Sequence, residues 1–305
     1  MPKWQETGQT SSYDAATRFF RQGTDFRRGL YSCFRRAARL DTWVGRARAA
    51  RQARRELAFE IPRSSGFQLF HPGRFAEAGE IIQVAEACVA RSHALLDSGT
   101  IRKKFLVNLL SSGDLTLESP LVRLALRPDV IAGVATYLGV VPVLTSISVF
   151  WSSWSENGLK SSQLYHCDGD DTSQVKIFAF CSDVGPENGP LTVVPADTSG
   201  RIRRQAKYRY RERVRDEDVG KWANEREQQA LVGQAGTVCF IDTSRCFHFG
   251  SRLQEGARPR LVAMIQYLTP FSFLLPFDYR RAAPFRHLAT ASSLSPRQRQ
   301  VLGSA

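Results

Sequence analysis

The sequence lacks the patterns that would place it in several common classes. None of its six cysteines forms a Cys-x-x-Cys pair, which argues against a zinc ribbon or a disulfide framework and favours reduced, mostly buried thiols. No run approaches the roughly 18 apolar residues that a membrane helix needs. The residues after Met1 contain no apolar signal core. We therefore expect a cytoplasmic protein with no transmembrane segment.

The charge of the chain is unbalanced. Its 42 Lys and Arg residues outnumber its 29 Asp and Glu residues, which gives a formal net charge of +13. Such a balance suits nucleic acid, an anionic membrane face or an acidic substrate. The sequence has no RNP aromatics, zinc finger or basic-zipper heptads, so nucleic acid is not the expected partner. Nothing in the sequence indicates the oligomeric state.

The first part of the chain is predicted to be helical. The 305 residues, 43% of them hydrophobic, suit one large domain or two small ones. Within residues 11–60, apolar residues recur at helical spacing between arginines: Phe19, Phe20, Phe26, Leu30, Phe34 and Leu40. We predict a basic helical arm over residues 1–62, which either packs on the main domain or binds a membrane surface or a partner. Further helices are expected at 73–98 and within 119–138.

From about residue 143 the sequence changes to a pattern typical of strands. Short runs rich in β-branched and aromatic residues alternate with Gly and Pro turns. The predicted strands are 144–151, 163–168, 175–184, 191–195, 237–242 and 261–268. Asn188-Gly189 predicts a hairpin between two of them. Many short strands around one core predict a sandwich or jelly roll, so the expected fold class is mainly β with flanking helices.

A polar segment at residues 200–230 interrupts these strands and is predicted to be helical. Its first half has a single acid, Glu212, against eight basic residues: Arg201, Arg203, Arg204, Lys207, Arg209, Arg211, Arg213 and Arg215. We expect this segment to form a lid over a substrate site, and its charge favours an anionic substrate.

Three residues form the pattern of a metal site. His166 and Asp168 are two positions apart in a predicted strand, where residues i and i+2 share a face. A second histidine, His248, follows the predicted strand 237–242. A lone His-x-Asp pair often arises by chance, but two histidines and one carboxylate are the ligand set that binds non-haem Fe(II) and leaves positions open. We predict that His166, Asp168 and His248 bind iron and are the catalytic residues.

Two basic residues are candidates for binding an anionic ligand beside that metal. Arg260 begins the strand after His248, so we expect these two residues on neighbouring strands of one sheet. A guanidinium can hold a carboxylate through two parallel hydrogen bonds, which a lysine cannot do with the same geometry. Lys176, on the strand after the His-x-Asp pair, either contacts the ligand or is a solvated strand lysine.

Residues 144–270 resemble the phytanoyl-CoA dioxygenase family of Fe(II)/2-oxoglutarate oxygenases. The blocks that carry the resemblance are Gln163-Leu164-Tyr165-His166-Cys167-Asp168, then Ser182-Asp183-Val184-Gly185-Pro186-Glu187-Asn188-Gly189-Pro190-Leu191, then Gly236-Thr237-Val238-Cys239-Phe240-Ile241-Asp242-Thr243 through His248, and finally Arg258-Pro259-Arg260-Leu261 with Tyr267. The chain departs from the family at Pro195-Ala196-Asp197-Thr198, where the family has Pro-Gly-Ser-His. This difference affects a loop near the substrate and no metal ligand.

The resemblance implies a double-stranded β-helix, the cupin-like jelly roll, with an N-terminal helical region. It implies Fe(II) on His166, Asp168 and His248, with 2-oxoglutarate as a co-substrate that chelates the metal and pairs its far carboxylate with Arg260. Lys176 is a further candidate contact. The expected organisation is an arm at 1–62, an oxygenase domain at 63–290 (helical part 73–140, jelly roll 143–270, lid 200–230) and a tail at 291–305.

The activity implied by the resemblance is hydroxylation of a small molecule by O₂, with release of succinate and CO₂. Asp168 favours hydroxylation over halogenation, because related halogenases have a small residue at this position that makes room for halide. Two alternatives stay open. One is an oxygenase that acts on nucleic acid or protein, and the other is a non-catalytic cupin-like binding module.

Overall fold

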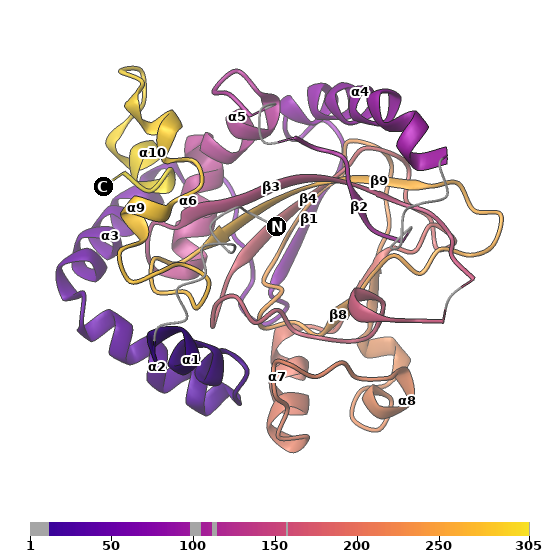
Figure 1. The fold of residues 1–305 in the computed structure, drawn as a ribbon, viewed down its shortest axis with the longest axis horizontal. Coiled ribbons are helices and arrows are strands. Elements are labelled where there is room, and N and C mark those ends of the chain that lie inside the picture. Colours follow the sequence, from indigo (N-terminus) through magenta and orange to yellow (C-terminus); the bar gives the residue numbers. More distant parts are fainter. Residues whose placement is uncertain (1–11, 98–104, 112–114, 157, 305) are drawn as a thin grey trace.

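The computed structural model describes residues 12–97, 105–111, 115–156 and 158–304, so the first residues of the predicted arm lie outside the described part. Two antiparallel sheets are surrounded by helices (Figure 1). The large sheet has the order β1-β7-β4-β9-β3-β2 and the small sheet the order β6-β5-β8. The strands are β1 Phe67–Phe70, β2 Val107–Asn108, β3 Val143–Ser152, β4 Val175–Phe180, β5 Leu191–Val193, β6 Gln229–Leu231, β7 Val238–Ile241, β8 His248–Phe249 and β9 Arg260–Leu268.

The helices lie on opposite sides of these sheets. In Figure 1, α4 runs along one side of the large sheet, whereas α7 and α8 lie at the other end of the molecule beyond β8. The helices are α1 Ser12–Arg21, α2 Asp25–Ala37, α3 Leu40–Ala53, α4 Glu77–Asp97, α5 Pro120–Leu126, α6 Pro128–Leu138, α7 Ala196–Gln205, α8 Asp216–Val219, α9 Tyr279–Ala282 and α10 Pro296–Val301. Antiparallel sheets with flanking helices are therefore confirmed. The prediction of a mainly β chain is wrong, because several strands are only two to four residues long and the helices contain more residues.

The two faces of strand β4 in the large sheet have different surroundings. Val175, Ile177 and Ala179 of β4 belong to the main core, which also includes residues of α4, α5 and α6. The alternate residues Phe178 and Phe180 pack in a second apolar cluster shared with the small sheet. Side chains two positions apart share a face, so Lys176 of β4 points to the same side as this second cluster. The pleat thus gives β4 one wholly apolar face and one face able to hold polar groups.

The turn at Asn188-Gly189 does not form the predicted hairpin. Strand β4 pairs with β7 and β9, whereas β5 pairs with β6 and β8, so the turn carries the chain from the large sheet to the small one. Gly189 has φ +63°, and a Cβ there would lie 2.5 Å from the backbone nitrogen of Arg252. The glycine is required by this close approach of two backbones rather than by a two-residue hairpin.

The N-terminal helices α1–α3 pack on the main domain through arginines. Arg28, Arg35 and Arg46 are almost completely buried. Their guanidinium groups donate to backbone carbonyls: Arg28 to Gly169 and Asp171, Arg35 to Ser272, Leu275 and Pro276, and Arg46 to Val141, Pro142 and Gln300. An arginine can pack this way because its stem is apolar and its five N–H groups satisfy several acceptors. The predicted packing of the arm is confirmed, but most of the apolar stripe faces solvent.

The C-terminal residues predicted as a tail also contribute to the main core. Val301 and Leu302, at the end of α10, are fully buried there. The domain boundaries at residues 62 and 290 stay predictions. Among the described residues, no helix combines the length and the apolarity needed to cross a bilayer. A cytoplasmic location stays a prediction as well.

The buried arginines give a test of how the arm is held. Replacing Arg46 by leucine removes the donors to Val141, Pro142 and Gln300 and leaves buried carbonyls without a partner. We expect Arg46→Leu to lower the free energy of unfolding by about 3 kcal/mol, measured by chemical denaturation. Arg48→Leu, on the exposed side of the same helix, is the matched control and should change it by less than about 0.5 kcal/mol. Equal effects of the two substitutions would contradict this account.

Candidate metal centre

The two histidines of the predicted triad face each other across a short antiparallel bridge. The backbone N–H of each donates to the carbonyl of the other, and both N–O distances are 3.0 Å. His248 is the first residue of β8, whereas His166 is paired only by this isolated bridge. The predicted regular strand at 163–168 is therefore wrong, because the chain turns before the bridge, at Ser161–Gln163, and leaves it directly afterwards.

Asp168 is positioned by a separate part of the chain. Its backbone N–H donates to the carbonyl of Thr243 at 2.8 Å, in the segment between β7 and β8. The backbone of residues 166–168 is thus held at both ends by the segment that leads to His248. This arrangement brings the carboxylate of Asp168 to the histidines. It does not depend on His166 and Asp168 sharing one face of a regular strand, as the sequence suggested.

Each imidazole is oriented by a hydrogen bond at its Nδ1 atom. Nδ1 of His166 lies 2.9 Å from the carbonyl of Leu164, and Nδ1 of His248 lies 2.9 Å from the carbonyl of Cys246. A carbonyl oxygen can only accept, so both Nδ1 atoms carry the proton and both Nε2 atoms keep a free lone pair. The ring centroids are 4.3 Å apart. The two rings therefore present their free nitrogens side by side.

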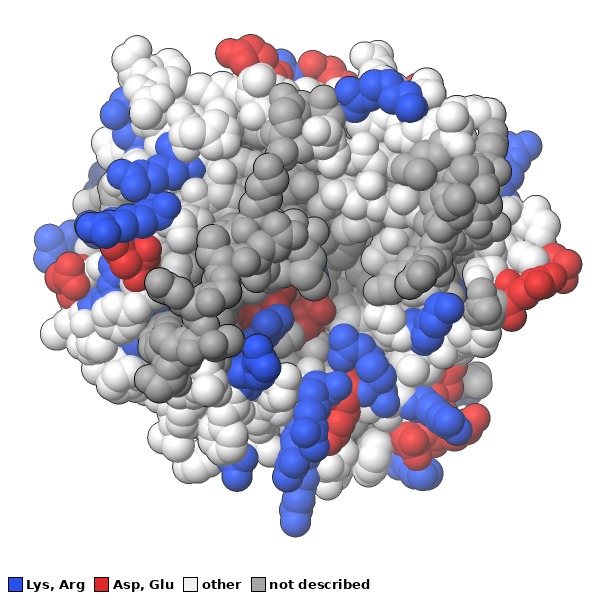
Figure 2. Space-filling view, viewed as in Figure 1, with Lys and Arg blue, Asp and Glu red and all other residues white. Residues whose placement is uncertain are grey.

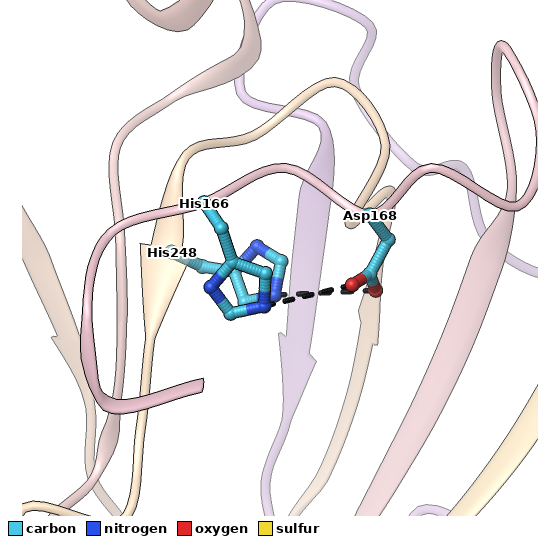
Figure 3. A group of neighbouring side chains, drawn as sticks. All are labelled: His166, Asp168 and His248. Carbon is cyan, nitrogen blue, oxygen red and sulfur yellow. Dashed lines mark ion pairs between the residues drawn. The ribbon is translucent and has the colours of Figure 1, made fainter. Parts of the chain in front are cut away.

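The carboxylate of Asp168 faces both free nitrogens, as Figure 3 shows. Its Oδ1 lies 3.6 Å from Nε2 of His166, and its Oδ2 lies 4.0 Å from Nε2 of His248. One possible ligand atom from each residue lies within 4.8 Å of the other two. The structure thus brings together His166, Asp168 and His248, and their donor set fits a metal ion bound by two nitrogens and one oxygen.

The protonation states suit metal binding at neutral pH. Burial, followed by the neighbouring His248, lowers the pKa of His166 to about 3, and burial also lowers the pKa of His248. Burial alone would raise the pKa of Asp168, but the ammonium group of Lys176 and the two neighbouring histidines together outweigh it and hold this pKa well below its usual range. Two neutral imidazoles and one carboxylate are the forms in which these side chains bind a metal.

Lys176 is partly buried and paired, which corrects the interpretation of a solvated strand lysine. Its Nζ lies 2.7 Å from Oδ2 of Asp168, and Nε2 of Gln174 donates to the same oxygen at 3.1 Å. Burial lowers the pKa of Lys176, but the carboxylates of Asp168 and Asp170 together raise it by more. Gln174 was missed from the sequence, although its position two residues before Lys176 was a signal that both side chains share a face. A contact of Lys176 with 2-oxoglutarate stays a prediction.

Arg260 is a buried guanidinium surrounded by neutral groups. It donates to the carbonyl of Gly189 and, at 2.6 Å, to Oγ of Ser251. Its Nε is buried without a hydrogen-bond partner, and no carboxylate among the described residues forms an ion pair with it. Burial lowers the pKa of Arg260 to about 10. This side chain therefore keeps a positive charge that the described protein atoms do not neutralise.

The position of Arg260 differs from the prediction in one respect. It begins β9 of the large sheet, whereas His248 begins β8 of the small sheet, so the two are not on neighbouring strands. They approach instead through the connection between these strands, because Arg260 bonds Ser251, three residues after His248. A cavity of about 50 Å³ adjoins Arg260 and is lined mainly by apolar side chains, among them Phe150, Phe178 and Val262. The guanidinium is thus the charged group of an otherwise apolar pocket.

The basic insertion, residues 200–230, packs against residues 165–167 on either side of His166. Val214 forms a bridge with Tyr165, and the hydroxyl of Tyr208 accepts from the N–H of Cys167 at 3.1 Å. Arg203 is buried and forms an ion pair with Asp25 at 2.9 Å, so its charge is already neutralised. The helical prediction for residues 200–230 is confirmed only at α7 and α8, because residues 206–215 form no helix and the segment ends in strand β6. Its action as a lid stays a prediction.

Comparisons with known proteins identify no family for this chain. No family model matches it, and no curated protein matches it. Among solved structures it is similar to EctD from S. alaskensis with bound Fe, with a TM-score of 0.49, 19% identity and coverage of 72% of this chain and 76% of that one. It is also similar to HygX from Streptomyces hygroscopicus with nickel and 2-oxoglutarate bound, with a TM-score of 0.43, 18% identity and coverage of 68% and 83%. Both TM-scores are below 0.5, so the function has to be argued from the residues of this chain.

Metal affinity tests the triad directly. We expect anaerobic titration of the metal-free protein with Fe(II) or Co(II) to show one site, and His248→Ala to weaken it at least about 100-fold because one of three ligands is lost. His287→Ala removes an exposed histidine elsewhere and should leave the affinity unchanged. Unaltered binding by the His248 variant would show that the metal binds at another place.

The lowered histidine pKa values predict how stability depends on pH. In the folded protein His166 binds a second ring proton only near pH 3, whereas in the unfolded chain it does so near pH 6.5. The stability that comes from keeping this imidazole neutral is therefore complete above about pH 6.5 and is lost as the pH falls toward 3. The free energy of unfolding of the metal-free protein should therefore fall below about pH 6.5, by about 1.4 kcal/mol per pH unit for His166. His166→Gln should remove about that slope in denaturation experiments, and His287→Gln should not. An identical slope in His166→Gln would be the contrary result.

Proposed function

We propose that this protein is an Fe(II)- and 2-oxoglutarate-dependent dioxygenase that hydroxylates a small molecule. The observation that carries the proposal is the pair of imidazoles anchored at Nδ1, whose free Nε2 atoms face the carboxylate of Asp168. Two neutral nitrogens and one carboxylate oxygen are the donor set of non-haem Fe(II) oxygenases. The resemblance of residues 144–270 to the phytanoyl-CoA dioxygenase family, with its double-stranded β-helix, supports the same assignment.

His166, Asp168 and His248 would hold the iron. When bound, Fe(II) and 2-oxoglutarate supply the oxidising chemistry, in which O₂ is consumed, 2-oxoglutarate is converted to succinate and CO₂, and one oxygen atom enters a C–H bond of the substrate. Lys176 and Gln174 both bond Oδ2 of Asp168. They fix the rotation of this carboxylate and leave Oδ1 without such bonds, so we assign Oδ1 as the metal ligand.

Arg260 would bind the carboxylate of 2-oxoglutarate that lies away from the metal. A buried guanidinium without a counter-charge is costly, and a ligand carboxylate would supply the missing negative charge through charge-assisted hydrogen bonds. The apolar side chains beside it suit the methylene carbons of such a ligand. Two neutral imidazoles and one carboxylate also leave one positive charge on Fe(II), which favours an anionic chelator. These features together support 2-oxoglutarate as the co-substrate.

The presence of Asp168 favours hydroxylation over halogenation, since its carboxylate occupies the position that a halide would need. The exposed basic residues of the insertion, such as Arg204 and Arg209, support an anionic substrate. Arg203 does not contribute to this argument, because Asp25 already neutralises it.

Succinate formation from 2-oxoglutarate tests the proposal. Anaerobically Fe(II)-loaded protein exposed to O₂ should form succinate slowly without substrate, and Asp168→Ala should abolish this turnover. Arg260→Ala should weaken 2-oxoglutarate about 100-fold, because a buried charge-assisted contact is lost. Arg258→Ala, which removes an exposed arginine two residues away, is the matched control and should leave the affinity unchanged.

The outcomes separate the proposal from its alternatives. Equal 2-oxoglutarate affinity in the two arginine variants would remove Arg260 from the co-substrate site. A wild-type protein that binds Fe(II) but neither binds 2-oxoglutarate nor forms succinate would be a non-catalytic metal-binding module. Binding of 2-oxoglutarate without turnover would mean that the substrate must be present before O₂ reacts.

A further inference from the structure

We propose that the outer face of α1–α3 is a docking surface for an anionic lipid bilayer. This surface, called here the apolar face, consists of Phe19, Phe26, Leu30, Phe34, Leu40, Trp43 and Val44. The inference is independent of the metal centre and of the function proposed for it. It concerns where the protein resides when it works.

The apolar face gathers most of the exposed large apolar side chains of the described protein. Ten such side chains are exposed among the described residues, and seven of them lie between Phe19 and Val44. Phe26 is 74% exposed, Phe34 is 59% exposed and Phe19 is 56% exposed. A helix that only served to pack on the domain would bury these rings. Exposed apolar patches of this kind mark interaction sites.

The spacing of these residues aligns them along one side of the helices. Phe26, Leu30 and Phe34 follow one another at intervals of four residues on α2, and Leu40, Trp43 and Val44 share a side of α3. The guanidinium of Arg27 lies over the ring of Phe19 at 4.9 Å and so links α1 to α2. The surface over α1 and α2, at the lower left of Figure 2, is mostly free of charged side chains, with Lys and Arg near its borders.

The same helices have a large excess of positive charge. Residues 15–55 contain twelve arginines and only two acids, Asp25 and Asp41, and Asp25 is already paired with Arg203. Arg18, Arg27 and Arg48 are exposed, and within the described residues none of the three forms an ion pair. Aromatic and aliphatic side chains flanked by arginines are the composition of helices that lie in the interface of an anionic membrane.

The inner side of these helices makes the apolar face a rigid surface. The buried arginines of α2 and α3 tie the helices to backbone carbonyls of the main domain, as described above. If the helices turned so that the apolar residues faced inward, the arginines would leave the interface. The backbone carbonyls would then lose their hydrogen-bond donors, and aromatic rings would pack against them instead. The fold therefore holds the apolar side chains outward, and their partner has to come from outside the described chain.

Charge complementarity selects the bilayer among the possible partners. A second copy of the chain would bring two sets of arginines against each other, and like charges at an interface are unfavourable. An anionic lipid surface supplies negative charge for the arginines and an apolar layer for the rings in the same plane. Each basic residue near such a surface adds attraction, which the net charge of +13 reinforces at longer range.

Vesicle flotation of the full chain tests this docking surface. The probes are phosphatidylcholine vesicles with and without about 30% phosphatidylglycerol, at low and at physiological salt. We expect binding to the anionic vesicles only, at least about tenfold weaker for the double variant Phe26→Ser, Phe34→Ser because two rings no longer enter the interface. Replacing Arg27 and Arg48 together by glutamine should weaken binding to the anionic vesicles, by about fivefold for each arginine removed.

Control variants replace exposed apolar residues and exposed arginines elsewhere on the molecule. Leu159→Ser with Val232→Ser, and Arg211→Gln with Arg258→Gln, should float like the wild type, and thermal melts should confirm that every variant is folded. Absence of binding to anionic vesicles at low salt would overturn the proposal, as would binding that the Phe26 and Phe34 changes leave intact. Concentration-dependent dimers that these changes abolish, without vesicle binding, would assign the surface to a second copy instead.

Discussion

The antiparallel bridge between His166 and His248 is the constraint on which the site depends. Its two backbone hydrogen bonds of 3.0 Å place the histidines opposite each other, although they are far apart in the sequence. Bonds from each Nδ1 to a carbonyl then fix the tautomers and leave the Nε2 atoms free. Because backbone atoms set this geometry, the fold itself holds the two free nitrogens side by side. Asp168 needs only to be brought against this pair, and Thr243 does so through a backbone bond.

Buried charge is handled in three different ways in this protein, and the differences separate structure from function. Arg28, Arg35 and Arg46 are satisfied by carbonyls and hold helices in place. Asp168 and Lys176, both partly buried, neutralise each other, so the carboxylate stays ionised. Arg260 also bonds only neutral acceptors, the carbonyl of Gly189 and the hydroxyl of Ser251, but it borders a cavity of about 50 Å³, and no described carboxylate forms an ion pair with it. An incomplete environment of this kind is what a ligand carboxylate would complete.

The chemistry of the site could be predicted from the sequence, but its geometry could not. His166, Asp168 and His248 were found from residue type and spacing, and the structure brings them together. The predicted strand at 163–168 was wrong, because its residues form only isolated bridges to distant segments. The predicted hairpin at Asn188-Gly189 was wrong, because the strands on its two sides pair in different sheets. Such long-range pairing leaves no local pattern in the sequence. The arm was predicted as helical, but its arginines face the domain and most of its apolar stripe faces solvent. The sequence could not show this, because the carbonyls that bind Arg28, Arg35 and Arg46 are distant in the chain.

Helix α2 connects the apolar face with the metal centre. Its outer side carries Phe26, Leu30 and Phe34, while Arg28 on its inner side donates to the carbonyls of Gly169 and Asp171, which follow Asp168 in the chain. Residues 168–171 are therefore separated from the apolar face by the thickness of one helix, about 10 Å. A bilayer bound at this face would place the metal centre close to the lipid headgroups. Under that geometry an amphipathic substrate held in the membrane surface would reach the site more readily than a freely diffusing polar one.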